Sequence, residues 1–104
     1  MFVTMNRFTI ATEFREAFED RFRQRESFLG EVPGFIRNTV LRPVEGSSNQ
    51  HIVMTLWTSR EAFENWTKSD SFRKAHANAG KTPTEWYAAP TKLDAFESVC
   101  DHSA

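Results

Sequence analysis

A histidine on an apolar helical stripe is the side chain of this sequence best suited to bind a metal. His76 follows Phe72 by four residues and precedes Ala79 by three, which places all three on one helix face. A neutral imidazole offers one lone pair to a metal and needs a partner for its other nitrogen. Its neighbours are small, with alanine at 75, 77 and 79 and then Gly80, so a flat ligand has room to bind. A core or surface histidine without a ligand is the alternative interpretation.

Asn6 lies in the middle of the strand expected over residues 2–10, where asparagine is depleted. It alternates in step with Phe2 and Phe8, which should face the helices of the domain. A buried amide without hydrogen-bond partners costs roughly 1–3 kcal/mol, so Asn6 needs a partner nearby. Two interpretations stay open: a hydrogen bond to a bound ligand, or one to a neighbouring backbone group.

Trp66 and two arginines complete the set of candidate side chains. Trp66 shares a helical stripe with Ala62 and Phe63, a pattern typical of the core, and its indole N–H needs an acceptor if buried. Arg21 and Arg25 are four residues apart and share a helix face, where they could meet the carboxylates of a ligand. A solvated face among Glu and Asp neighbours is the simpler interpretation of the two arginines.

Other motifs for catalysis are absent from the sequence. No HExxH or CxxC spacing is present, the four glycines form no phosphate loop, and no G-x-S-x-G segment occurs. A metal site built from protein ligands alone is therefore not expected, whereas a metal carried by a macrocycle needs only one axial ligand. No role is predicted for His51, His102 or Cys100.

The order of expected elements predicts an α+β domain of the ferredoxin-like, split βαβ kind over residues 1–104. Strands are expected over 2–10, 35–43, 50–57 and 91–99. The first helix is expected to have Thr12 as its N-cap and to carry an apolar stripe as far as Leu29. Thr58 and Glu61 match a capping box for the second helix, Ser69 can cap a further segment, and residues 80–90 read as a loop.

The strand over residues 50–57 carries information about assembly. Ile52, Met54 and Leu56 should point to one face, and Val53 and Trp57 to the other, so both faces are apolar. Two helices can cover only one face of a four-stranded sheet, which predicts a homodimer in which a second copy covers the other face. A single scattered, exposed tryptophan is the alternative.

The totals exclude several classes of protein. Thirteen Lys and Arg against 14 Asp and Glu leave a net charge of −1, without the basic surplus typical of nucleic-acid binders. No apolar run approaches the roughly 20 residues of a membrane span, and the first residues do not resemble a signal peptide. The single cysteine excludes an intrachain disulfide, and we therefore expect a cytoplasmic protein.

Three motifs resemble those of a known family. The segment from Trp57 to Trp66 is similar to the W-x-S-x-E-A-F-x-x-W segment of the antibiotic biosynthesis monooxygenase superfamily. The F-x-x-A-H pattern ending at His76 and the R-F-x-x-R pattern from Arg21 to Arg25, together with Asn6, resemble the Isd-type haem-degrading monooxygenases. The resemblance covers about residues 1–99.

The resemblance implies a function and a role for each residue. His76 would ligate haem iron, Asn6 would donate to the oxygen ligand on iron, and Trp66 would push the macrocycle out of plane. Haem would be substrate and cofactor at once, opened by O2 and an external electron donor with release of iron. The resemblance also implies a homodimer with a shared β-barrel. The expected haem-binding residues are Asn6, Arg21, Phe22, Arg25, Trp66, Phe72 and His76, with Asn6, Trp66 and His76 catalytic.

Two other functions remain open at this point. The superfamily segment also permits a cofactor-free monooxygenase that acts on a quinol-like aromatic, with the Asn, Trp and His side chains around a reactive phenolate. A non-enzymatic dimer that stores, carries or senses haem would use the same binding residues without turnover. The tetrapyrrole product, the regiochemistry and the electron donor are not predicted.

Overall fold

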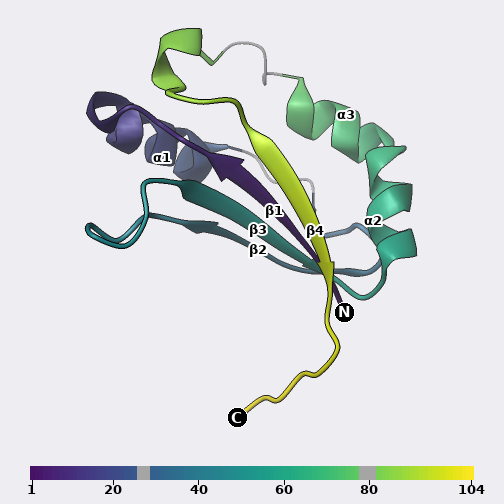
Figure 1. Cartoon of the computed structure of the whole chain (residues 1–104). Coiled ribbons are helices and arrows are strands. Elements are labelled where there is room, and N and C mark those ends of the chain that lie inside the picture. The colour runs from purple at the N-terminus through teal and green to yellow at the C-terminus, as the bar shows by residue number, and fades with distance from the viewer. Residues whose placement is uncertain (26–28, 78–81) are drawn as a thin grey trace.

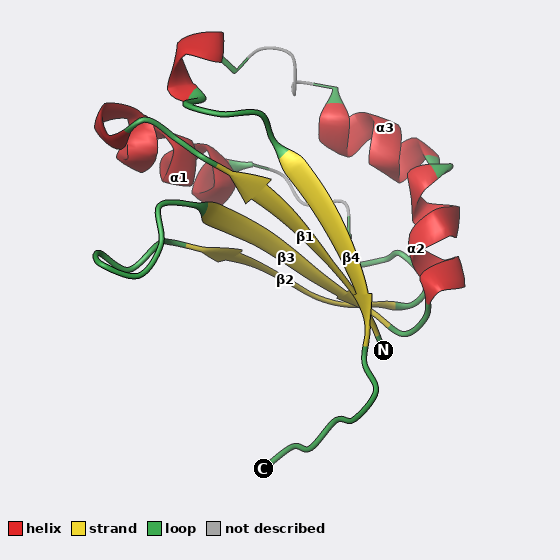
Figure 2. Cartoon of the chain, viewed as in Figure 1, coloured by secondary structure: helices red, strands yellow, loops and turns green. Residues whose placement is uncertain are grey.

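A four-stranded antiparallel sheet forms one layer of the chain, and the helices that the structure describes lie on one side of it (Figures 1 and 2). The computed structural model describes residues 1–25, 29–77 and 82–104. The spatial strand order is β2-β3-β1-β4, and the strands are β1 (Phe2–Phe8), β2 (Phe35–Leu41), β3 (His51–Trp57) and β4 (Lys92–Glu97). This order confirms the ferredoxin-like split βαβ fold.

The helices form two groups over the two ends of the sheet (Figure 2). The first group is the 3-10 turn η1 (Thr12–Phe14) followed by α1 (Arg15–Gln24), and the second is α2 (Arg60–Thr67) followed by α3 (Asp70–His76). A last 3-10 turn, η3 (Thr84–Trp86), precedes β4. Phe8 packs on Phe18 of α1 while Phe2 packs on Phe63 of α2, so both groups cover the same sheet face.

Several expected boundaries differ from those in the structure. The first helix was expected at Thr12, but α1 begins at Arg15 because Thr12 lies in η1 and its side chain caps nothing. Ser59, and not Thr58, caps α2, since the Ser59 hydroxyl accepts from the Ala62 N–H at 3.1 Å. Each expected strand is one to three residues too long. Ser69 caps α3 as predicted, whereas Ala79 and Gly80 lie outside the described residues.

The main apolar core lies between β3 and the second helical group. Phe2, Leu29 and Trp57 are buried there, and the last is fully inaccessible to solvent. The partly buried apolar residues around them are Val32, Phe35, Ala62, Phe63 and Trp66. Because Trp57 is buried, the alternative of an exposed tryptophan on this strand is wrong. Gly34 has a φ of +83°, and a Cβ there would lie 2.4 Å from the Ala62 side chain, so only glycine fits this approach.

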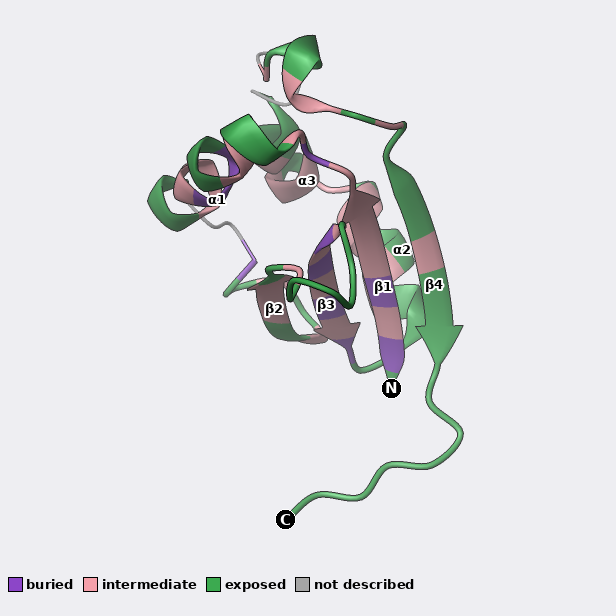
Figure 3. Ribbon diagram, turned by 60° about the vertical axis from the view of Figure 1, so that its left-hand side comes forward, coloured by how far each residue is buried: buried purple, intermediate pink, exposed green. Residues whose placement is uncertain are grey.

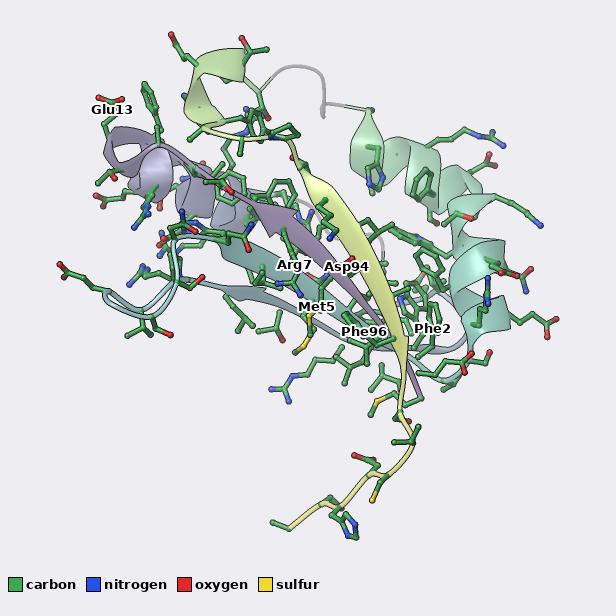
Figure 4. The ribbon with its side chains drawn as sticks, viewed as in Figure 1. Phe2, Met5, Arg7, Glu13, Asp94 and Phe96 are labelled. Atoms are coloured by element: carbon green, nitrogen blue, oxygen red, sulfur yellow. The ribbon has the colours of Figure 1, made fainter. Side chains whose placement is uncertain are left out.

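The other sheet face has no helix over it within the described residues. It carries the half-buried Ile52, Met54 and Leu56 of β3, as their alternation predicted, beside Met5 of β1 and the 45% exposed Phe96 of β4. The Arg7 side chain donates to Asp94 at 2.8 Å on this face, which holds the pKa of the Asp94 carboxyl below its usual value. Figure 4 shows Met5, Arg7 and Asp94 close together.

Burial is uneven across the sheet. Figure 3 shows buried residues along β1 and β3, while β4 and the C-terminal segment are mostly exposed. In the part of the chain that the structure describes, no helix is long and apolar enough to cross a lipid bilayer.

Candidate functional site

Trp66, Phe72 and His76 form an aromatic cluster where α2 meets α3. The Phe72 ring lies edge-on to Trp66 with centroids 4.9 Å apart, and it lies 4.2 Å from the His76 ring at a tilt of 31°. Trp66 and His76 are 5.8 Å apart. Ser69 links the backbones of Trp66 and Phe72, because its hydroxyl accepts from the Phe72 N–H and donates to the Trp66 carbonyl at 2.6 Å. The chain therefore turns between the two helices and brings the predicted residues together.

The His76 imidazole has one nitrogen engaged and one available. Its Nδ1 lies 2.9 Å from the backbone carbonyl of Phe72. A carbonyl only accepts, so Nδ1 must carry the hydrogen and the lone pair resides on Nε2. The residue is exposed, and Nε2 has no hydrogen-bond partner among the described residues. This is the tautomer and the supporting contact that metal-binding histidines ordinarily show.

The indole N–H of Trp66 is buried and finds no acceptor in the described part of the chain. The same holds for the indole of Trp57, whose ring lies 5.3 Å from that of Trp66. The expectation that a buried Trp66 would need an acceptor is thus not met by the protein itself. A groove of about 890 Å³ between the 30–34 segment and the second helical group touches Trp66, but Asn6 and His76 do not line it.

Asn6 lies on the helix-facing side of β1, as its alternation with Phe2 and Phe8 predicted. It pairs in register with Val53 of β3 and Leu93 of β4, so the three side chains share one face. Asn6 is partly exposed, and its amide makes no hydrogen bond to any residue that the structure describes. Leu93 is 53% exposed although it is apolar, and the sequence analysis missed it as a neighbour of the candidate site.

The candidate residues of α1 and Arg25, which directly follows it, contact aromatic rings and one amide, two of them on residues that were not predicted from the sequence. The Arg25 guanidinium lies 4.6 Å above the Phe22 ring and donates to the Asn38 amide oxygen at 3.3 Å. The Arg21 guanidinium lies 5.7 Å from the centroid of Trp86, a residue of the segment expected to be a plain loop. Both arginines thus rest on aromatic rings near the protein surface.

A buried ion-pair network lies beneath α1. Glu19 accepts from His51 Nε2 at 2.8 Å and from Arg42 Nε at 2.9 Å. The Arg42 hydrogen bonds are the main reason that the pKa of Glu19 falls from 4.5 to about 2, against the opposing effect of burial. His51 is fully buried, although its sequence context predicted no role, since Glu19 lies 32 residues away along the chain.

Six of the seven predicted site residues fall into three places, and Arg21 lies apart from them against Trp86. Trp66, Phe72 and His76 contact one another, and Phe22 and Arg25 contact one another. Among the described residues, no hydrogen bond, ion pair or ring contact joins these two groups to each other or to Asn6. No three metal-ligating side chains converge within residues 1–25, 29–77 and 82–104. The individual roles in ligand binding stay predictions.

Comparisons with known proteins place these observations in context. Residues 1–78 match the family described as "Antibiotic biosynthesis monooxygenase". The "Heme oxygenase (staphylobilin-producing)" of Staphylococcus haemolyticus is 36% identical over 86 residues, or 82% of each chain. The structure of the heme-degrader MhuD from Mycobacterium tuberculosis with two hemes in its active site has a TM-score of 0.77 and 29% identity, and covers 99% of this chain and 100% of its own. SnoaB, a cofactor-independent oxygenase from Streptomyces nogalater, has a TM-score of 0.69 and 26% identity, with coverages of 96% and 94%.

Proposed function

Because the chain belongs to the antibiotic biosynthesis monooxygenase family, as its motifs predicted, we propose that it is a haem oxygenase. It binds haem as its substrate and opens the porphyrin ring with O2 and electrons from an external donor. The curated relative with 36% identity is a heme oxygenase, and the similar heme-degrader of known structure holds heme in its active site. The release of iron and a linear tetrapyrrole follows from opening the ring.

The observation that carries the proposal is the free Nε2 of His76. An axial ligand to haem iron must present a lone pair, and the Nδ1 contact with the Phe72 carbonyl leaves that lone pair on Nε2. The exposure of His76 allows a ligand to approach, and the Phe72 ring at 4.2 Å limits rotation of the imidazole. A protein with one imidazole ligand leaves the opposite side of the iron open to O2.

Trp66 and Asn6 have two further roles in the proposed reaction: the first bends the macrocycle, and the second donates a hydrogen bond. The Trp66 ring packs against the same cluster as His76, so it can press on one side of a macrocycle bound at Nε2 and bend it. The Asn6 amide has N–H groups that no described residue uses, which makes it a donor for the side where O2 reacts. Arg21 and Arg25 bring positive charge for the haem propionates, and Phe22 and Phe72 bring apolar rings for its faces.

The test is a haemin titration followed by a reductant such as ascorbate in air. We expect a sharp Soret band on binding, and its decay with release of chelatable iron during turnover. Asn6→Ala should bind haemin with nearly unchanged affinity but degrade it about 100-fold more slowly, the usual effect of losing one hydrogen-bond donor at a reacting oxygen. Asn49→Ala, in the exposed turn before β3, is the matched control and should behave as the wild type. An unchanged haemin spectrum with the wild type would refute the proposal.

A cofactor-independent oxygenase is the second candidate, supported by the similarity to SnoaB at 26% identity. Such an enzyme would consume O2 in the presence of a hydroquinone without haem, and it would not sharpen or shift the Soret band of added haemin. The same titration therefore separates the two functions, and haemin binding without ring opening would indicate a haem carrier or sensor.

The functional unit in this proposal is a homodimer built on the open sheet face. The face presents Ile52, Met54 and Leu56 in the middle and Phe96 at the edge strand, and a second copy of the same apolar surface is its natural complement. We expect a dimer by sedimentation, and Met54→Glu should dissociate it because the carboxylate would be buried. With a single cysteine the chain forms no intrachain disulfide, which favours a location in the cytoplasm, where an external reductase could reach the protein.

A further inference from the structure

The network of Glu19, His51 and Arg42 joins three elements beneath the first helical group. Glu19 lies on α1 and His51 begins β3, while Arg42 follows the last residue of β2. Glu19 accepts from His51 Nε2 at 2.8 Å, and Arg42 donates from Nε to both carboxylate oxygens at 2.9 and 3.1 Å. Arg23 adds a weaker contact at 3.3 Å. One carboxylate therefore holds α1 against two strands.

The network of Glu19, His51 and Arg42 is more buried than an ion pair on the protein surface. The Glu19 side chain is only 10% exposed and His51 is fully buried, whereas Arg42 is 66% exposed and reaches in from the surface. His51 Nδ1 is buried with no partner among the described residues, so Glu19 provides the one hydrogen bond of this imidazole. Burying polar groups is costly unless each one is hydrogen-bonded or paired, and His51 Nδ1 is not.

Ring contacts connect the network to the proposed haem-binding residues of α1. The His51 ring packs edge-on against Phe18 at 5.2 Å, and Phe18 packs against Phe22 at 5.0 Å. Phe22 in turn lies beneath the Arg25 guanidinium. Glu19 and Phe22 are also three residues apart and share one side of the helix, where both line a groove of about 300 Å³ beside Val40.

We infer that Glu19 is a positioning residue of the haem site: through His51 and Arg42 it fixes α1 on the sheet and thereby sets where Phe22 and Arg25 meet the substrate. Glu19 itself does not touch haem. The inference rests on the proposed function, and it explains why a buried ion pair is placed beneath the helix that carries these side chains. Small displacements of substrate-positioning residues reduce reaction rates strongly, which gives the network a functional consequence.

The experiment compares three variants of the full chain by haemin titration and by the rate of ring opening. Glu19→Gln keeps the size of the side chain and removes its charge, and Arg42→Gln removes the partner that is mostly exposed and should fold without difficulty. Asp20→Asn is the matched control, because it removes an exposed ion pair with Arg23 on the same helix. Circular dichroism establishes that each variant is folded before haemin is added.

We expect Glu19→Gln and Arg42→Gln to weaken haemin affinity by about tenfold, and to broaden or shift the Soret band in fully folded protein. Asp20→Asn should match the wild type, and Glu19→Asp should recover part of the affinity. If Glu19→Gln does not fold, the Arg42→Gln spectrum decides. Wild-type affinity and spectrum in folded Glu19→Gln or Arg42→Gln would overturn the inference and leave the haem oxygenase proposal intact. A wild type that does not bind haemin would instead refute the proposed function itself.

Discussion

The two helical groups cover the same sheet face but are held to it by different interactions. The first group is held by the buried Glu19 carboxylate. Its oxygens accept hydrogen bonds from His51 of β3 and from Arg42, which directly follows β2. The second group is held by ring packing among Trp57, Phe63 and Trp66, and its helices begin at serine caps. Both groups leave a buried polar atom without a partner in the described residues: His51 Nδ1 beneath the first, and the indole N–H of Trp66 in the second.

In the proposed function, this difference in bonding corresponds to two roles: the first group positions side chains, and the second binds the ligand. Where polar groups satisfy one another, as Glu19 and Arg42 do, the protein has used its hydrogen bonds on its own structure. At His76 a lone pair, and at Trp66 a buried N–H, have no partner among the described residues, and the proposed function assigns a ligand to this cluster. In the proposed function the second helical group would be the binding side, and the first would orient the residues that complete it.

The largest expected effect is the loss of haem binding when the free imidazole is removed. His76→Ala should weaken haemin affinity by at least about 100-fold, because even contacts that only support a metal ligand contribute about 10- to 100-fold. His102→Ala, near the exposed C-terminal end, is the control and should leave the titration unchanged. Equal spectra for His76→Ala and the wild type would reverse the assignment of the binding side.

An intermediate effect is expected on the free energy of unfolding when the pH is lowered, through Glu19 of the first helical group. The folded pKa of Glu19 is about 2 against an ordinary 4.5, so the unfolded state takes up the proton first as pH falls. The resulting stabilisation is complete above pH 4.5 and is lost as pH falls towards 2. We estimate it at roughly 2–3 kcal/mol, since solvent screens the mostly exposed Arg42.

Urea unfolding of the wild type and of Glu19→Gln measures this increment directly. The difference between the two free energies of unfolding should be largest at pH 7 and should shrink by about half at pH 3. Asp20→Asn should differ from the wild type by no more than about 0.5 kcal/mol at either pH. A difference for Glu19→Gln that does not change with pH would show that the carboxylate charge does not stabilise the first group.

The smallest effect concerns the caps of the second helical group. Ser59→Ala should lower the free energy of unfolding by about 1 kcal/mol, because the Ala62 N–H loses its acceptor. Thr58→Ala is the control and should have little effect on this cap, and the loss in Ser59→Ala should be the same at pH 7 and pH 3. An equal or larger loss in Thr58→Ala would restore the capping box that the sequence pattern predicted.

Local patterns were sufficient for much of the architecture. Alternation along 50–57 predicted both the strand and its two apolar faces, and the spacing from Phe72 to His76 predicted the helical face that the structure shows. The motif around Trp66 predicted the family, which the match over residues 1–78 confirmed. Helix starts were less accurate: the capping-box pattern favoured Thr58, which has Glu61 three residues on, but the backbone geometry makes the adjacent Ser59 the cap.

Contacts between residues far apart in sequence lie outside the reach of such patterns. His51 had no readable role because its partner Glu19 is 32 residues away, and Leu93 reaches the side of Asn6 only through the pairing of β1 with β4. Chain periodicity reports which way a side chain points from its own element, since that depends on nearby backbone geometry. Which side chain it then meets depends on how the elements pack, and that is decided by the free energy of the whole fold.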